Sequence, residues 1–219
     1  MRIFILLIVI AFFFNCNSKK SKEKLDKESL TEKSFKQKIQ KNEDLKSQII
    51  FDEEKNIYTN LEYGITVNFP DNWETDMGTT QNSLIRGFEK DSGITMIIIP
   101  IELKKNTKIY NHQKQLISFY EKKKDDFDSF NLRLMEEMTG RKISNYKSKK
   151  SYIRNQPTIQ SKFTTIMRHL DYEYEMTTIN HQFWKDPYSY TISLSLPSTF
   201  YKDNQEEYNW LFTNISFTK

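Results

Sequence analysis

The apolar run of residues 3–14 places the strongest constraint on what this chain can fold into. The run follows Arg2, is apolar on every side, and ends at Asn15, where a lysine-rich segment begins. A helix needs about 20 apolar residues to cross the hydrocarbon core of a bilayer, so this run is too short for a stable span. Its length and its flanks are those of the apolar region of a secretory signal peptide. We therefore expect residues 1–15 to direct export.

The only cysteine of the chain, Cys16, follows this run directly. The segment resembles a bacterial lipoprotein signal peptide, in which a peptidase cuts just before the cysteine and the thiol carries diacylglycerol. The resemblance covers residues 1–16 and implies lipidation of Cys16. Several acyl chains together hold a protein stably at a membrane. The expected location is therefore the cell envelope, with a lipid anchor in a membrane, the outer one in a Gram-negative cell.

The three residues before the cysteine depart from the lipoprotein pattern. That pattern favours Leu, a small residue and then Gly or Ala, whereas this chain has Phe13, Phe14 and Asn15. Cleavage at another position, or retention of the leader as an uncleaved anchor, therefore stays an alternative.

Residues 17–56 are dominated by charged and amide side chains and contain neither Gly nor Pro. Their apolar residues miss the three-to-four spacing of a helix that packs on a partner. We interpret residues 16–56 as the lipidated cysteine followed by a charged tether, disordered or loosely helical. The alternative is a helix that forms on contact with a protein partner. The remaining residues, 57–219, are long enough to fold as one domain, and without a second cysteine they must do so without a disulfide.

Alternation of apolar and polar residues and the positions of Pro and Gly predict the elements of this domain. We expect strands at 61–69, 84–89, 94–103, 158–167, 172–183, 188–196 and 215–217, and helices at 109–127 and 202–212. Residues 141–154 are interpreted as a strand with an exposed loop. Strands in consecutive pairs with helices between them indicate an α+β fold, an antiparallel sheet with helices packed on it.

Three short motifs in residues 57–219 resemble the PsbP-like group. The first is Tyr63-Gly64-Ile65-Thr66-Val67-Asn68-Phe69-Pro70-Asp71-Asn72-Trp73, which is similar to the first hairpin of the group. The second is Asn155-Gln156-Pro157 before a strand, and the third joins Leu194-Ser195-Leu196-Pro197, a helix and Asn214-Ile215-Ser216-Phe217. The resemblance implies a sheet of about six strands with helices on both faces. It also implies a non-catalytic accessory or binding module, because most members of the group have that role.

Charge and motif content argue against several classes of function. The formal net charge is only +4, and no basic run alternates with aromatic residues, so nucleic acid is not an expected partner. The chain has no Gly-x-Ser-x-Gly motif, no second cysteine and no Gly-rich phosphate loop. We therefore expect no catalytic residues, no cofactor and no enzymatic activity.

One group of residues has the spacing of a metal site. His169, Asp171, Glu173 and Glu175 alternate, so in a strand they would share one face and could hold Ca²⁺ or Zn²⁺. We favour a different interpretation, in which these residues form the solvent face of an antiparallel strand and Tyr172 and its even-numbered neighbours pack inward. His181 follows in the same strand and has no evident partner.

Aromatic residues gather near the last expected hairpin, as Tyr172, Tyr174, Phe183, Trp184, Tyr188 and Tyr190. They would suit a binding surface if exposed at a cleft, but a sheet core with cross-strand pairs explains them as well. The sequence thus predicts an envelope lipoprotein that acts as a non-catalytic accessory or as a binding module for a protein or a small molecule. The alternatives are a metal-dependent or hydrolytic envelope enzyme, and a structural protein that binds a partner through its tether.

Overall fold

The structure, a computed structural model, describes residues 49–77, 83–103, 112–169, 172–203 and 205–217. In these ranges the strands are β1 (Ile49–Asp52), β2 (Ile57–Asn60), β3 (Ile65–Asn68), β4 (Trp73–Asp76), β5 (Ile85–Glu89), β6 (Thr95–Glu102), β7 (Ile143–Ile153), β8 (Gln156–His169), β9 (Tyr172–Lys185), β10 (Tyr188–Pro197) and β11 (Ile215–Phe217). The helices are α3 (His112–Lys122), α4 (Lys124–Thr139), α5 (Ser198–Asp203) and α6 (Gln205–Thr213).

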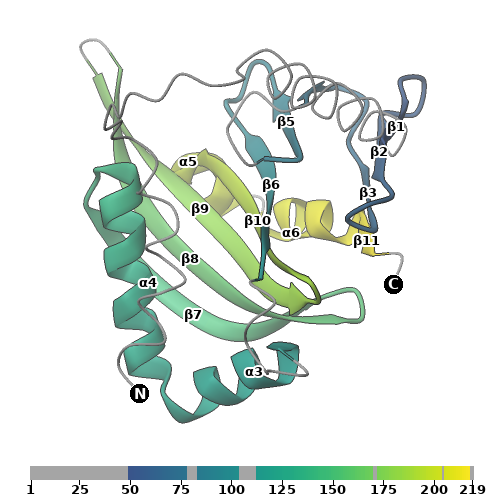
Figure 1. The fold of residues 1–219 in the computed structure, drawn as a ribbon. Helices are drawn as coiled ribbons and strands as arrows, with labels where there is room; N and C mark the ends of the chain where they lie inside the picture. The colour runs from purple at the N-terminus through teal and green to yellow at the C-terminus, as the bar shows by residue number, and fades with distance from the viewer. Residues whose placement is uncertain (1–48, 78–82, 104–111, 170–171, 204, 218–219) are drawn as a thin grey trace, which may run out of the picture. The chain divides into compact units, whose positions relative to one another are not determined.

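The strands form two antiparallel sheets (Figure 1). The smaller has the order β1-β2-β3-β11, and the larger has the order β4-β5-β6-β10-β9-β8-β7. Long hairpins of consecutive strands build the larger sheet, so most of its neighbours are also neighbours in sequence. The smaller sheet needs the C-terminal strand β11 to pair with β3, near the start of the domain.

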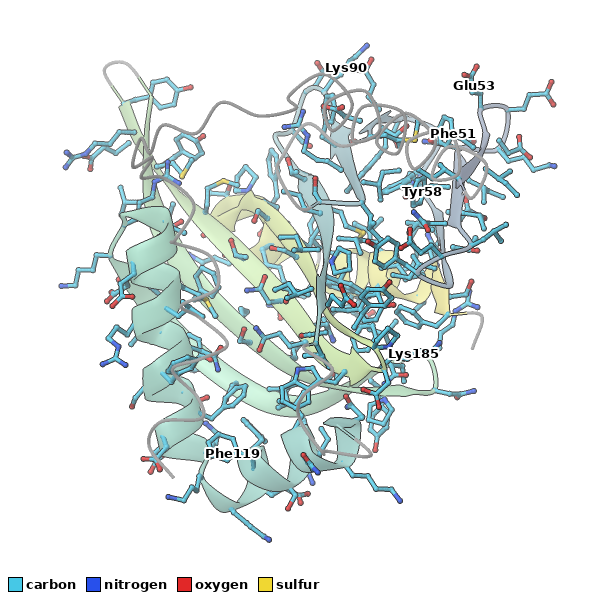
Figure 2. The ribbon with its side chains drawn as sticks, viewed as in Figure 1. Phe51, Glu53, Tyr58, Lys90, Phe119 and Lys185 are labelled. Carbon is cyan, nitrogen blue, oxygen red and sulfur yellow. The ribbon has the colours of Figure 1, made fainter. Side chains whose placement is uncertain are left out.

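One apolar core fills the space between the two sheets. Along β10, every second residue from Tyr190 to Leu196 is at most 1% exposed, while the residues between them are half-buried. This period of two is what a strand with one fully buried face requires. The smaller sheet contributes Tyr58 and Ile65, both fully buried (Tyr58 is labelled in Figure 2). The apolar alternation of both sheets is thus satisfied by packing them against each other.

Helices α3 and α4 cover the other face of the larger sheet, near β7, β8 and β9 (Figure 1). A second apolar cluster forms there from Leu116, Tyr120, Phe127 and Ile159. Beside it, the Ser148 hydroxyl donates to Asp128 of α4 over 2.5 Å and lies 2.8 Å from the Tyr120 hydroxyl. These polar contacts fix β7 to both helices.

Most of the predicted elements are present, and several of them differ in extent. The strand expected at 61–69 is β3 alone, because a turn at Gly64 (φ +59°) separates it from β2. The helix expected at 109–127 is two helices, α3 and α4, because Lys123 between them has a non-helical backbone (φ −143°, ψ 47°). Residues 141–154 hold one strand of eleven residues, β7, where a strand and a loop were expected.

The predicted fold class is correct in that the strands are antiparallel, and wrong in the number of sheets and in what covers them. One sheet of about six strands with helices on both faces was expected, and the structure has sheets of four and seven strands with four short helices in the described ranges. The reason is that β2, β3 and β11 form a separate sheet, which supplies much of the apolar cover of the second face. Helices α5 and α6 add the buried Tyr201, Leu211 and Phe212 to that core, and the half-buried Tyr208 packs against it.

The N-terminal edge of the smaller sheet lies inside the segment interpreted as a tether. Strand β1 (Ile49–Asp52) pairs with β2 along its whole length, although the tether was expected to continue to residue 56. Residues 1–15, Cys16 and most of the tether lie outside the described residues. Of the helices that the structure does describe, none has the length and hydropathy of a membrane span.

Candidate functional site

A pocket of about 500 Å³ lies between the larger sheet and the two C-terminal helices. Its sheet wall comes from β7, β8 and β9, and its helix wall comes from α5 and α6. Because successive strand residues point to opposite faces, the odd-numbered residues 147–153 of β7 face this pocket, while the side chains of Ser148 and Lys150 contact α4 and α3, so that Ser148 and Tyr152 border the pocket from the other face. The lining residues are Lys147, Ser148, Lys149, Ser151, Tyr152, Ile153, Gln160, Lys162, His181, Tyr201, Gln205, Asn209, Phe212 and Thr213.

His181 lies at the buried end of this pocket, only 2% exposed. Its Nδ1 is 2.9 Å from the Thr158 hydroxyl, and its Nε2 is 2.9 Å from the Gln160 side-chain nitrogen. Because that amide nitrogen donates, Nε2 accepts and Nδ1 carries the proton of a neutral imidazole. The ring also packs on Phe212 of α6, with 4.4 Å between ring centroids. Both ring nitrogens are thus occupied by side chains of the protein itself.

Burial and a nearby lysine keep this imidazole neutral. Loss of water around the ring is the main cause, and the positive charge of Lys149 is the second; together they lower the pKa of His181 from 6.5 to about 4. A buried imidazolium would have to be desolvated beside a cation, which is costly. At neutral pH His181 therefore acts as a hydrogen-bonding structural group in the pocket wall.

Three lysines give the pocket its charge. Lys147 and Lys162 are direct cross-strand partners on β7 and β8, and Lys149 is two residues further along the same face of β7. The Lys162 ammonium lies 4.9 Å from the ring centroid of Tyr201. Among the described lining residues none is acidic. The pocket wall is thus positively charged.

The metal-like group of the sequence is not assembled in the part of the chain that can be described. Asp171 and the side chain of His169 lie outside the described residues, as does the side chain of His112. Glu173 forms an ion pair with Arg168, across the β8–β9 hairpin. Across the described ranges, no three His, Cys, Asp or Glu side chains come close enough together to hold a metal ion. Tyr172 was expected to pack inward and is instead 59% exposed, because the end of this hairpin extends beyond the core.

The aromatic residues of the sequence occupy three separate places. Phe183 and Tyr190 belong to the core and stack with 5.0 Å between centroids. Trp184, on the opposite face of β9, packs on the cluster under α3. Tyr172 and Tyr174 contact each other at the far end of β9. They do not form one binding surface, and none of them lines the pocket.

The sequence shows two parts of the pocket without showing the pocket itself. His181 has no evident partner in the sequence, and residues 141–154 are rich in lysine. The available signal was the spacing of Lys147 and Lys149, which a strand places on one face. What brings Gln160, Lys162 and Phe212 to the same place is the pairing of the strands and the packing of α6.

Comparisons with known proteins find structural likeness and no relative in sequence. No family model matches the chain, and no curated protein matches it. The solution structure of cyanobacterial PsbP (CyanoP) from Synechocystis is similar with a TM-score of 0.47 and 9% identity, over 74% of this chain and 91% of that one. A crystal structure of a protein from Bacteroides thetaiotaomicron is similar with a TM-score of 0.44 and 12% identity, over 71% of this chain and 46% of that one. These likenesses carry no functional residue over to this chain.

Proposed function

We propose that the chain is an exported lipoprotein with a PsbP-like domain, held at a membrane of the cell envelope by acyl chains on Cys16. The domain acts as a non-catalytic module that binds a ligand in the pocket between β7–β9 and α5–α6. Support for the anchor comes from the sequence alone: an apolar leader too short to span a bilayer, with the single cysteine directly after it. The PsbP-like motifs of residues 63–73 and 194–217 support the choice of a binding module.

The observation that carries the binding role is the pocket itself. Its volume of about 500 Å³ falls within the roughly 300–1,000 Å³ range of small-molecule sites. Apolar side chains such as Ile153 and Phe212 line it together with polar groups such as Gln160 and Asn209. A wall of this mixed kind binds the carbon skeleton of a ligand and fixes its orientation.

The chemistry of His181 favours binding over catalysis. Among the described lining residues it is the one side chain whose ordinary pKa lies near neutrality. A general base must have a free nitrogen within hydrogen-bond reach of the reacting group. Thr158 and Gln160 occupy both nitrogens of His181, so the ring can neither take a substrate proton nor ligate a metal without losing a buried hydrogen bond.

Mass spectrometry of the full chain, extracted from membranes in detergent, tests both parts of the proposal. Under denaturing conditions we expect a mature N-terminus at Cys16 with acyl chains on it. Under native conditions we expect a retained small molecule. Cys16→Ala should release the protein from membranes or leave an uncut precursor, and Asn17→Ala should behave like the wild type. A Cys16→Ala variant that matures and fractionates normally would exclude the anchor.

A further inference from the structure

We propose that the pocket binds a small organic molecule through its phosphate group, with Lys147, Lys149 and Lys162 as the phosphate-binding residues. This inference rests on the proposed function, which assigns a ligand to the pocket, and it specifies the chemistry of that ligand.

The register of the sheet places the three lysines at neighbouring positions on one face. Lys147 lies directly opposite Lys162, and Lys149 lies opposite Gln160. Directly opposed side chains in an antiparallel pair have Cβ atoms about 5 Å apart, and like charges there destabilise the sheet. Within the described residues none of the three lysines forms an ion pair, whereas Lys150, the residue after Lys149 and on the other face of β7, pairs with Glu121. A bound anion would supply the missing negative charge.

The shape and composition of the pocket favour a phosphate over a carboxylate. A concave wall of one charge sign concentrates the potential and raises the local concentration of anions. Lysine binds phosphate as a point charge, whereas the paired donors of arginine match carboxylate and phosphate alike, so in a lysine-lined wall the number of charges decides between the two anions. The described lining residues include three lysines and no arginine. A doubly charged phosphate monoester therefore fits this wall better than a single carboxylate.

The remaining walls require that the phosphate belongs to a larger molecule. Phe212 and Ile153 offer apolar contact, and Gln160 and Asn209 offer hydrogen bonds to hydroxyl groups. A free inorganic phosphate would leave most of the roughly 500 Å³ volume without contact. Two sources share the required phosphate monoester: a soluble phosphorylated metabolite, and the headgroup of phosphatidic acid in the membrane that carries the anchor.

Calorimetric titration of the full chain in phosphatidylcholine nanodiscs tests this assignment. We expect glycerol phosphate to bind and glycerol not to bind, with an affinity that falls as salt rises. Lys147→Gln and Lys162→Gln should each weaken binding about tenfold, the usual loss for one hydrogen bond to a charged group. The matched control is Lys150→Gln, on the same strand but facing α3, which should change the affinity less than twofold.

Nanodiscs that contain phosphatidic acid distinguish the two sources. If these nanodiscs reduce the binding of glycerol phosphate to the wild type but not to Lys162→Gln, the ligand is a lipid headgroup. If they do not compete, the ligand is a soluble phosphorylated molecule. Either result supports the proposal.

Failure of this inference can be separated from failure of the proposed function. The inference is overturned if glycerol phosphate does not bind at millimolar concentration, or if Lys150→Gln weakens binding as much as Lys162→Gln does. Asn209→Trp fills the pocket from α6, and Glu206→Trp is its control on an exposed position of the same helix. If Asn209→Trp alone removes the molecule retained in native mass spectrometry while glycerol phosphate fails to bind, the pocket binds a ligand of other chemistry. If no molecule is retained and glycerol phosphate does not bind, both proposals are wrong.

Discussion

Acidification should destabilise the domain through His181. The ring is 2% exposed and neutral in the folded chain, with its pKa lowered from 6.5 to about 4 by burial and by Lys149. In the unfolded chain the same ring takes up a proton near pH 6.5. Between those two pH values the unfolded state therefore binds more protons, and the free energy of unfolding must fall as pH falls. Above pH 6.5 the ring is neutral in both states and contributes no pH dependence.

The magnitude follows from the two pKa values. One pKa unit corresponds to about 1.4 kcal/mol, so the shift of His181 from 6.5 to about 4 removes about 3 kcal/mol of stability once pH is below both values. Between pH 7 and pH 5, where the unfolded ring is largely protonated and the folded ring is not, the expected loss is about 2 kcal/mol. That is a large fraction of the total for a domain whose net stability is about 5–15 kcal/mol.

Urea unfolding at pH 7 and pH 5 measures this effect, with His181→Gln as the comparison. Glutamine does not titrate and can still hydrogen bond to Thr158 or Gln160, so the variant should lose about 2 kcal/mol less than the wild type over this interval. Carboxylates and the other histidines titrate in both proteins and cancel in the difference. Equal losses in the two proteins would refute the assignment of a depressed pKa to His181.

Two further substitutions test the packing of the core. Gly87→Ala would place its Cβ 2.2 Å from the ring of Phe69, so we expect overpacking to lower the free energy of unfolding, measured in urea, by about 1–3 kcal/mol. The control is Gly93→Ala, whose added Cβ meets no atom within 4 Å at a residue with φ +71°. It should cost only the backbone strain, about 1 kcal/mol. Phe183→Ala, at a side chain that is fully buried between the sheets, should cost about 3–5 kcal/mol, whereas Phe200→Ala, 40% exposed, should change the melting temperature little. A Phe183→Ala variant as stable as Phe200→Ala would contradict the core described here.

The hairpins of the larger sheet could be predicted because their signals are local. The strands at 158–167, 172–183 and 188–196 were predicted from alternation, and β8, β9 and β10 contain them. Pro197, expected to end the last of these strands, is its final residue. In contrast, β7 shows little alternation because it is the edge strand of the sheet, with much of both faces exposed. Edge strands commonly carry lysines, so its composition resembles that of a loop.

The pocket could not be predicted from the sequence because each of its walls is set by a distant partner. Alternation places Lys147 and Lys149 on one face of β7, but it does not say that Lys162 lies opposite. The partners of His181 are Thr158 and Gln160 on β8 and Phe212 on α6, all at least twenty residues away in sequence.

By itself, the sequence determined the strands of the main hairpins, because a period of two marks strands without reference to the rest of the chain. Only the tertiary structure decided that β2, β3 and β11 form a second sheet, and that α5 and α6 enclose a basic pocket against β7–β9. The physical reason is that alternation specifies which face of a strand is buried, whereas the identity of the surface that buries it depends on contacts between residues far apart in the chain.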